Sequence, residues 1–145
     1  MADNRRNLFK RLTRLFRSGP VVKRNVINPD SKYTISDRLW AGHKRRLKEH
    51  RSKGNGFGYQ LFNEDSEYVS TISARYYKDG SEILIAQKGK NPRALTEREC
   101  ARILGFPEEF QHHNSKKQSY QQFGNSVAVP VVQAVGTSII NALRN

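Results

Sequence analysis

The sequence predicts a small mixed α/β fold: a short β element beside a basic helix, followed by C-terminal helices. Helical periodicity recurs in separate segments, and two β-branched runs lie between them. Glycine or proline follows most of these segments and marks their ends. With 145 residues, of which 36% are hydrophobic and 27% charged, the chain can build one core of modest size.

The first 30 residues form a basic amphipathic N-terminal extension. A helix is predicted over residues 7–17, where Leu8, Leu12 and Leu15 share one face and arginine and lysine occupy the opposite face. Ser18-Gly19-Pro20 ends it. This helix either covers the protein's own core or docks on a partner or an anionic surface.

A second helix is predicted from Asp37 to about Lys53. Thr34 or Ser36 can cap it. Its buried side is marked by Leu39, Trp40, His43 and Leu47, and its far end carries six basic residues against one glutamate. The glycine-rich stretch 54–59 ends the helix and lets the backbone approach another surface closely.

Two strands are predicted at residues 69–74 and 82–86, with Asp79-Gly80 as the turn between them. Residues 87–92 then read as a basic connector. Thr96-Glu-Arg-Glu99 is a capping box that opens the next helix, with Leu95 and Cys100 as its hydrophobic staple and Gly105 as its end.

The last helix is predicted to begin near Val129-Pro130. It carries an apolar stripe, and the rest of the chain has few apolar residues left to cover it. Burying five such side chains would contribute on the order of 1.5–3 kcal/mol each. Left exposed, the stripe would mark a surface for a partner. Its members are Val132, Val135, Ile139, Ile140 and Leu143.

Composition limits the possible functions. The formal net charge is +13, from 26 basic and 13 acidic residues, which favours a polyanionic partner, either nucleic acid or an anionic membrane surface. A single cysteine excludes an internal disulfide and a cysteine-based metal site. No apolar run of membrane-spanning length and no signal peptide are recognised, so we expect a cytoplasmic protein.

No complete active site is predicted. Cys100 falls one turn inside a capped helix, which favours packing over nucleophilic catalysis. The adjacent carboxylates Glu64-Asp65 and Glu108-Glu109 read as solvated loop residues.

A DNA-binding surface is better supported by the sequence. Basic side chains neutralise phosphates, asparagine and arginine read base edges, and aromatic rings stack or wedge. The alternative is a solvated charged face with structural tyrosines. The predicted contacts are Lys44, Arg45, Arg46, Lys53, Asn55, Phe57, Tyr59, Arg75, Tyr76 and Lys78.

Two sequence blocks carry a family resemblance. They are Asn91-Pro-Arg-Ala-Leu-Thr-Glu-Arg-Glu99 and, nearer the end, Gln122-Phe-Gly-Asn-Ser-Val127. In this order they resemble the last two blocks of the cytosine-5 DNA methyltransferases. The stretches 54–59 and 71–81 look most like the branch that includes the bacterial enzyme Dcm and its restriction-system relatives. The resemblance covers about residue 33 to the end and leaves out the first 30 residues.

The resemblance implies that residues 31–90 form a target-recognition region for double-stranded DNA, with Ser73 among its contacts, and that residues 91–145 hold the C-terminal methyltransferase blocks. It implies that Asn125, Ser126 and Val127 line the pocket of S-adenosylmethionine. It also implies a supporting block that props up the recognition region. The residues of that block are Pro92, Arg93, Thr96, Arg98 and Glu99.

The chemical blocks of the family are absent from this sequence. It has no Pro-Cys pair to attack the cytosine, no Glu-Asn-Val segment and no glycine-rich cofactor block. The leading hypothesis is a small subunit that supplies target recognition and completes the cofactor pocket of a larger catalytic chain. The alternatives are a DNA-binding module or regulator, and a truncated methyltransferase without function. A neighbouring reading frame with the missing blocks would favour the small subunit of a split enzyme, and a complete methyltransferase nearby would favour the regulator.

Overall fold

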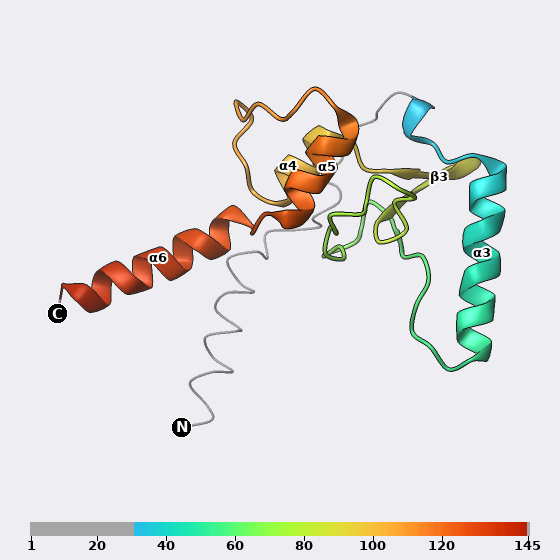
Figure 1. Ribbon diagram of the computed structural model, residues 1–145, viewed down its shortest axis with the longest axis horizontal. Helices are drawn as coiled ribbons and strands as arrows, with labels where there is room; N and C mark the ends of the chain where they lie inside the picture. Colours follow the sequence, from blue (N-terminus) through green and yellow to red (C-terminus); the bar gives the residue numbers. More distant parts are fainter. Residues whose placement is uncertain (1–30, 145) are drawn as a thin grey trace.

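The computed structural model describes residues 31–144, so the predicted helix at residues 7–17 lies outside the described part. The predicted mixed α/β fold is confirmed. A small sheet and helix α3 lie at one end, α4 and α5 lie in the middle, and α6 projects from the opposite end (Figure 1). The elements in chain order are η1 (Ser31–Tyr33), α3 (Asp37–Ser52), β1 (Leu61–Phe62), β2 (Leu84–Gln87), β3 (Lys90–Ala94), α4 (Glu97–Ile103), α5 (Lys116–Asn125) and α6 (Val129–Leu143).

The sheet has three strands in the order β1-β2-β3. β1 runs parallel to β2, whereas β3 is antiparallel to β2 and joins it through the turn at Lys88-Gly89. Gly89 has a φ of 68°, a left-handed conformation that suits glycine in such a turn. The predicted connector at residues 87–92 was therefore wrong, since most of it is the β2–β3 hairpin.

The strand predicted at residues 69–74 was also wrong. This segment leads into a series of turns, in which the amide of Tyr76 donates to the carbonyl of Ser73 at 3.0 Å and the amide of Lys78 to that of Arg75 at 2.9 Å. Ile72 and Tyr76 are both buried in the core. The β-branched composition of the segment thus serves core packing, and tertiary contacts override its strand propensity.

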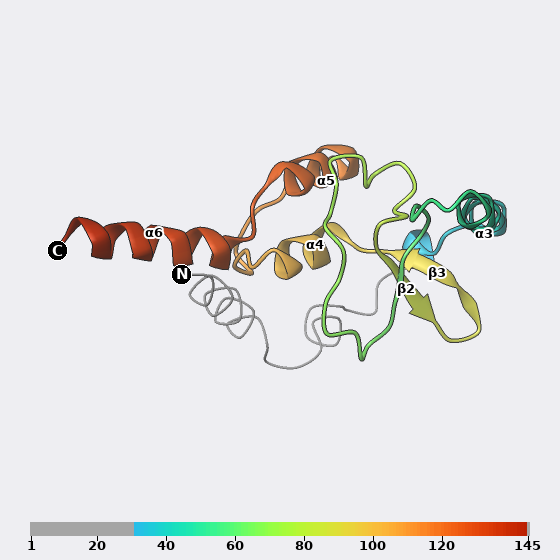
Figure 2. The same cartoon turned by 90° about the horizontal axis from the view of Figure 1, so that it is seen from below.

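The core lies between the sheet and helices α4 and α5, which lie side by side in both views (Figures 1 and 2). Tyr76 and Tyr120 meet edge to face at its centre, with ring centroids 5.1 Å apart. The remaining buried members are Phe62, Ile72, Ile83, Ile85, Leu95, Cys100, Ala101 and Phe123.

Helix α3 matches its prediction closely. Ser36 caps it, accepting a hydrogen bond from the amide of Leu39 at 3.3 Å. His43 is its one buried residue, while the other members of the predicted buried side are half-buried. The helix ends before Gly54, which has a φ of 70°.

Helix α4 has the predicted capping box. Thr96 accepts from the amide of Glu99 at 3.1 Å, and the Glu99 carboxylate accepts from the amide of Thr96 at 2.7 Å. Leu95 and Cys100, the predicted staple, are both fully buried. Gly105, with a φ of 80°, follows the helix as predicted.

Helix α6 begins at Val129, as predicted, and its start is fixed to the end of α4. The amide of Val129 donates to the carbonyl of Leu104 at 2.8 Å. A Cβ on Gly105 would lie 2.7 Å from Cδ of Pro130, so only glycine allows this approach. Beyond this junction α6 contains no buried residue.

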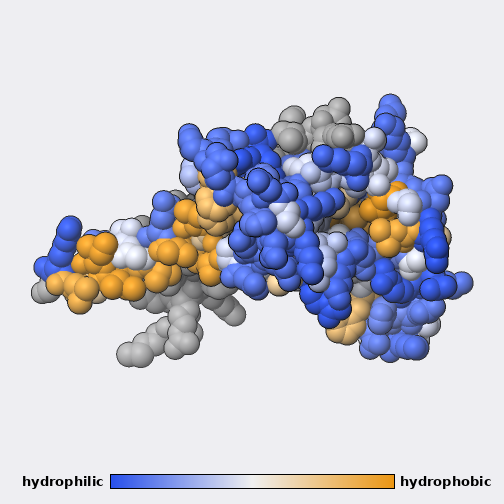
Figure 3. Space-filling view, turned by 45° about the horizontal axis from the view of Figure 1, so that its top comes forward, coloured by the Kyte–Doolittle hydropathy of each residue, from blue (hydrophilic) through white to orange (hydrophobic). Residues whose placement is uncertain are grey.

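The apolar stripe of α6 is exposed, as the shortage of covering residues suggested. Figure 3 shows it as a continuous hydrophobic strip along the projecting helix. Val132, Val135, Ile139 and Ile140 are each half or more exposed. By length and composition alone, an 18-residue window in Lys116–Leu143 is apolar enough to cross a membrane, although one such helix is only weak evidence for a membrane span. Extended backbone at Ser126 separates the two helices, and α6 itself is about 22 Å long, less than the roughly 30 Å of a bilayer core.

Candidate nucleic-acid interface and cofactor-facing segment

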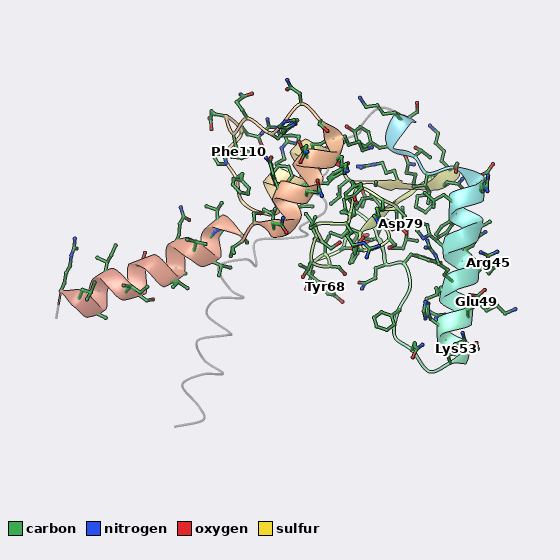
Figure 4. All side chains as sticks on the ribbon, in the orientation of Figure 1. Arg45, Glu49, Lys53, Tyr68, Asp79 and Phe110 are labelled. Carbon is green, nitrogen blue, oxygen red and sulfur yellow. The ribbon has the colours of Figure 1, made fainter. Side chains whose placement is uncertain are left out.

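The basic side chains of α3 lie on its solvent side. Lys44, Arg45, Arg46 and Lys53 are all exposed, which the predicted phosphate contacts require. Arg45, Glu49 and Lys53 follow one another along the helix in Figure 4. Arg45 and Glu49 form an exposed i,i+4 ion pair at 3.6 Å, which contributes little to stability and leaves the cationic surface open to a polyanion.

The glycine-rich loop after α3 presents a single aromatic side chain. Phe57 is 71% exposed and meets the ring of His50 edge to face, at a centroid distance of 5.8 Å. Asn55 is exposed beside it. Tyr59 is half-buried and packs edge-on against Trp40 at 4.7 Å, so its ring also holds the loop on α3. The loop thus offers an amide and an aromatic ring next to the basic helix.

The turns at residues 73–80, here called the recognition turn, carry the second group of predicted contacts. Arg75 and Lys78 are exposed there. Ser73 is half-buried, and its hydroxyl donates to the carboxylate of Glu82. This bond fixes the start of the turn and leaves Arg75 and Lys78 free to meet a ligand.

The predicted DNA contact of Tyr76 is contradicted by the structure, since this side chain is only 2% exposed. Its hydroxyl donates to the carbonyl of Ile83 at 2.6 Å and accepts from the amide of Leu95 at 2.8 Å. Burial raises the pKa of Tyr76 well above its usual value, which keeps the hydroxyl protonated. Tyr76 therefore supports the recognition turn from beneath.

A buried histidine ties the recognition turn to α3. Arg46 donates to Nδ1 of His43 at 2.9 Å and to the carboxylate of Asp79 at 3.1 Å. Because Nδ1 accepts, Nε2 carries the proton and donates to the carbonyl of Asp79 at 3.3 Å. Burial lowers the pKa of His43, which favours this neutral tautomer. Arg46 thus has a structural role beside its predicted DNA contact, and Asp79 lies between α3 and the rest of the body in Figure 4.

The predicted supporting block connects the sheet with α4. Arg93, on β3, is 3% exposed and forms two hydrogen bonds of 2.9 Å with the fully buried carboxylate of Glu99. Pro92 is buried, and its carbonyl accepts from the amide of Ile35 at 3.0 Å. Arg98 is half-buried, and one of its terminal nitrogens has no hydrogen-bond partner among residues 31–144.

The predicted cofactor segment begins with the last residue of α5 and continues to Val127. Asn125 is exposed. Ser126 donates to the carbonyl of Phe123 at 2.8 Å, and Val127 is 59% exposed. The three residues offer an amide, a hydroxyl and an apolar side chain on an open surface. They fit one wall of a binding site, which a second surface would have to complete.

Helix α5 and Gly124 were missed from the sequence. The signal for the helix was the spacing of Ser119, Tyr120 and Phe123, which are its three buried residues. Gly124 lies inside this helix, where a Cβ would come within 2.2 Å of the backbone of Ser73 and Ala74. A glycine inside a helical pattern often has such a packing reason, but its partner could not be read from the sequence.

The described residues contain no reactive thiol. Cys100 is fully buried, and burial raises its pKa well above the usual value. Over residues 31–144 no group of three His, Cys, Asp or Glu side chains could hold a metal ion. The described arrangement can bind and position, but it cannot supply a cysteine nucleophile.

Comparison with known proteins identifies the family. The family model of C-5 cytosine-specific DNA methylases matches residues 4–141, so the match includes most of the N-terminal segment that we expected to lie outside the resemblance. The type II methyltransferase M1.ScrFI of Lactococcus lactis subsp. cremoris is 60% identical over 115 residues, which cover 79% of this chain and 30% of the relative.

Other relatives are likewise matched over most of this chain but over only about a third of their own length. M.SsoII of Shigella sonnei is 57% identical over 88% of this chain and 33% of its own length. The DNA-cytosine methyltransferase of Escherichia coli K12 is 39% identical over 86% of this chain and 31% of its own length. The chain thus spans about a third of the curated relatives that it matches.

Solved structures agree with the fold. The methyltransferase EhMeth of Entamoeba histolytica superposes with a TM-score of 0.66 at 20% identity, covering 86% of this chain and 41% of that one. The Dnmt2 methyltransferase of S. pombe gives the same TM-score and coverage at 19% identity. With a family match across nearly its whole length and relatives up to about 60% identical, this chain belongs to the C-5 cytosine-specific DNA methylase family.

Proposed function

We propose that this chain is the C-terminal, DNA-recognising part of a cytosine-5 DNA methyltransferase and acts as a small subunit. In this role it reads double-stranded DNA and completes the S-adenosylmethionine pocket, while a larger chain brings the catalytic cysteine. The observation that carries the proposal is the burial of Cys100, the single thiol of the sequence, in a member of a family of methyltransferases. Such a thiol cannot reach a cytosine ring.

The charge distribution supports the DNA-reading part of the proposal. Exposed basic residues along α3 would hold phosphates, and the formal net charge of +13 favours association with a polyanion. Arg75 and Asn55 have the side-chain types that pair bidentately with guanine and adenine. Phe57, on its glycine-rich loop, would stack or wedge against bases.

The exposed stripe of α6 supports the association with a larger chain. A helix whose apolar side chains are half or more exposed along most of its length is unusual on the surface of an isolated protein. Its start is fixed by the contact between Gly105 and Pro130, so the stripe is presented in a defined direction. Packing of this stripe on the catalytic chain would bring Asn125–Val127, just before it, to the shared cofactor pocket.

A reconstitution experiment tests the proposal. The chain is mixed with a related methyltransferase that has been cut before its recognition region, and association is followed by calorimetry. Val135→Lys combined with Ile139→Lys should weaken association at least tenfold, because each change places a charge in the apolar contact. Thr137→Lys with Asn141→Lys, two exposed residues on the polar side of α6, is the matched control and should leave association nearly unchanged. Equal affinities for both double variants would refute the role of the stripe.

Two single variants separate the DNA and cofactor roles in the assembled enzyme. Arg75→Ala should reduce discrimination between target and mismatched sites by about 1–3 kcal/mol. Lys90→Ala, which changes an exposed basic residue at the start of β3, is its control. Asn125→Ala should weaken S-adenosylmethionine binding, while DNA affinity measured without the cofactor stays nearly intact. A loss for Arg75→Ala that is equal on all sequences would make it a phosphate contact instead.

A DNA-binding module that regulates without methylating is the second candidate, favoured by the same basic surface. Salt-sensitive DNA binding by the chain, together with no association and no methyl transfer in the mixture, would support it. Absence of both association and DNA binding would indicate a chain without function.

A further inference from the structure

The two halves of the proposed site meet at one backbone contact. Gly124 lies on α5, immediately before the cofactor segment 125–127, and packs against the start of the recognition turn. A Cβ built on Gly124 would lie 2.2 Å from the amide nitrogen of Ala74 and from the carbonyl carbon of Ser73. Real Cβ atoms essentially never approach other atoms so closely, so any larger residue must displace one of the two backbones.

The backbone conformation does not explain this glycine. Gly124 lies within the regular helix α5 and is not among the glycines with positive φ. Within a helix glycine is less favourable than alanine, by about 1 kcal/mol in the interior and by less in the last turn, where Gly124 lies. The close approach of the recognition turn is therefore the reason that glycine stands here.

Rigid neighbours hold both sides of the contact. On the α5 side, the hydroxyl of Tyr120 donates to the carbonyl of Leu95. On the other side, the hydroxyl of Tyr76 accepts from the amide of the same Leu95 at 2.8 Å, and the two tyrosine rings meet edge to face. The two sides of the Gly124 contact are thus joined a second time through Leu95, and neither can shift alone without breaking a buried hydrogen bond.

We infer that Gly124 is a positioning residue that couples occupancy of the cofactor segment to the placement of the recognition turn. Arg75 follows the contacted peptide by one residue, and Asn125 follows Gly124 directly. A ligand that fixes Asn125–Val127 also fixes the turn that carries Arg75. By linkage, S-adenosylmethionine raises affinity for target DNA by the same factor as target DNA raises affinity for S-adenosylmethionine. This inference rests on the proposed function of both segments.

The test compares Gly124→Ala with Gly42→Ala, a helical glycine in α3 whose added Cβ would meet nothing within 4 Å. The readout is the ratio of target-DNA dissociation constants without and with S-adenosylmethionine, measured on the assembled enzyme. We expect a ratio of about fivefold or more for the unchanged chain and for Gly42→Ala, and a ratio near one for Gly124→Ala. An unchanged ratio in Gly124→Ala would overturn the inference.

Hydrogen exchange provides a second measurement that needs no variant, in case Gly124→Ala does not fold. Addition of S-adenosylhomocysteine to the assembled enzyme should slow exchange at the amides of residues 73–78 at least fivefold. If the cofactor analogue binds and these amides are unaffected, the coupling is refuted while the proposed function stands. If the assembled enzyme binds neither cofactor nor DNA, the proposed function itself fails, and the coupling fails with it.

Discussion

The clearest perturbation is Tyr76→Phe, which removes one hydroxyl from the centre of the core and keeps the ring. That hydroxyl bonds to the carbonyl of Ile83 and the amide of Leu95 at 2.6 and 2.8 Å. Both groups would lose this partner in the core, since Tyr76 itself is only 2% exposed. A buried unsatisfied amide costs about 1–3 kcal/mol, and each lost hydrogen bond about 0.5–1.5 kcal/mol.

We therefore expect Tyr76→Phe to lower the free energy of unfolding by about 2–3 kcal/mol. For a chain of this size the melting temperature should fall by roughly 5–12 °C. The assay is urea unfolding followed by far-ultraviolet circular dichroism. Tyr68→Phe is the matched control, since Tyr68 is 74% exposed, and it should change the free energy of unfolding by less than about 0.5 kcal/mol.

The same variant also decides between a structural and a DNA-binding role for Tyr76. With temperature kept well below melting, target-DNA affinity should stay within about twofold of the unchanged chain, because the hydroxyl never reaches solvent and the ring contact with Tyr120 and the Gly124 contact still hold the recognition turn. A variant that is as stable as the unchanged chain would refute the buried role, whether or not it also loses DNA discrimination.

Three further predictions follow from buried groups. Arg93→Met leaves the carboxylate of Glu99 buried without its guanidinium and should cost about 3–5 kcal/mol in urea unfolding, and a loss below 1 kcal/mol would contradict the assigned pair. Burial lowers the pKa of His43 in the folded state, so neutral His43 stabilises the fold above the unfolded-state pKa of about 6.5, and this stabilisation is lost as the pH falls through the folded-state pKa. His43→Gln should therefore reduce the loss of unfolding free energy on the acid side. An equal loss in the variant and the unchanged chain would exclude His43 as its source. Cys100, fully buried with a raised pKa, should react with Ellman's reagent roughly 100-fold or more slowly in the folded protein than in urea, and equal rates would contradict its burial.

Local signals in the sequence were sufficient for the helices α3, α4 and α6. Capping residues, periodic apolar side chains and terminal glycines all act within one or two turns, so Ser36, the capping box at Thr96 and Pro130 could be read directly. The exposure of the apolar stripe of α6 could also be predicted, because the rest of the sequence has too few apolar residues to bury it.

The β element could not be placed in the same way. Val69, Thr71 and Ile72 have strand propensity, yet the segment packs into the core and turns, while the hairpin forms around Lys88-Gly89. Which run pairs with β2 depends on non-local contacts, above all on Tyr76 reaching Leu95, 19 positions away in sequence.

The same contrast between local and non-local signals applies to the candidate site. Exposed basic and aromatic residues on α3 and its loop were predicted from their chemistry and are on the surface. Tyr76 shared that chemistry and was misplaced, because an aromatic ring serves a core as readily as a DNA surface. Gly124 was not recognised, because its role depends on having no side chain and on the backbone of Ser73 and Ala74, which approaches it only in the folded chain.

Methyl transfer from labelled S-adenosylmethionine to mixed-sequence DNA tests the central claim most directly. The chain is assayed alone and then together with a related methyltransferase cut before its recognition region. Our account predicts incorporation in the mixture only, since the chain's single thiol is buried and the second chain brings the catalytic cysteine. Incorporation by the chain alone would contradict it, as would a mixture that binds DNA and S-adenosylmethionine yet transfers no methyl group.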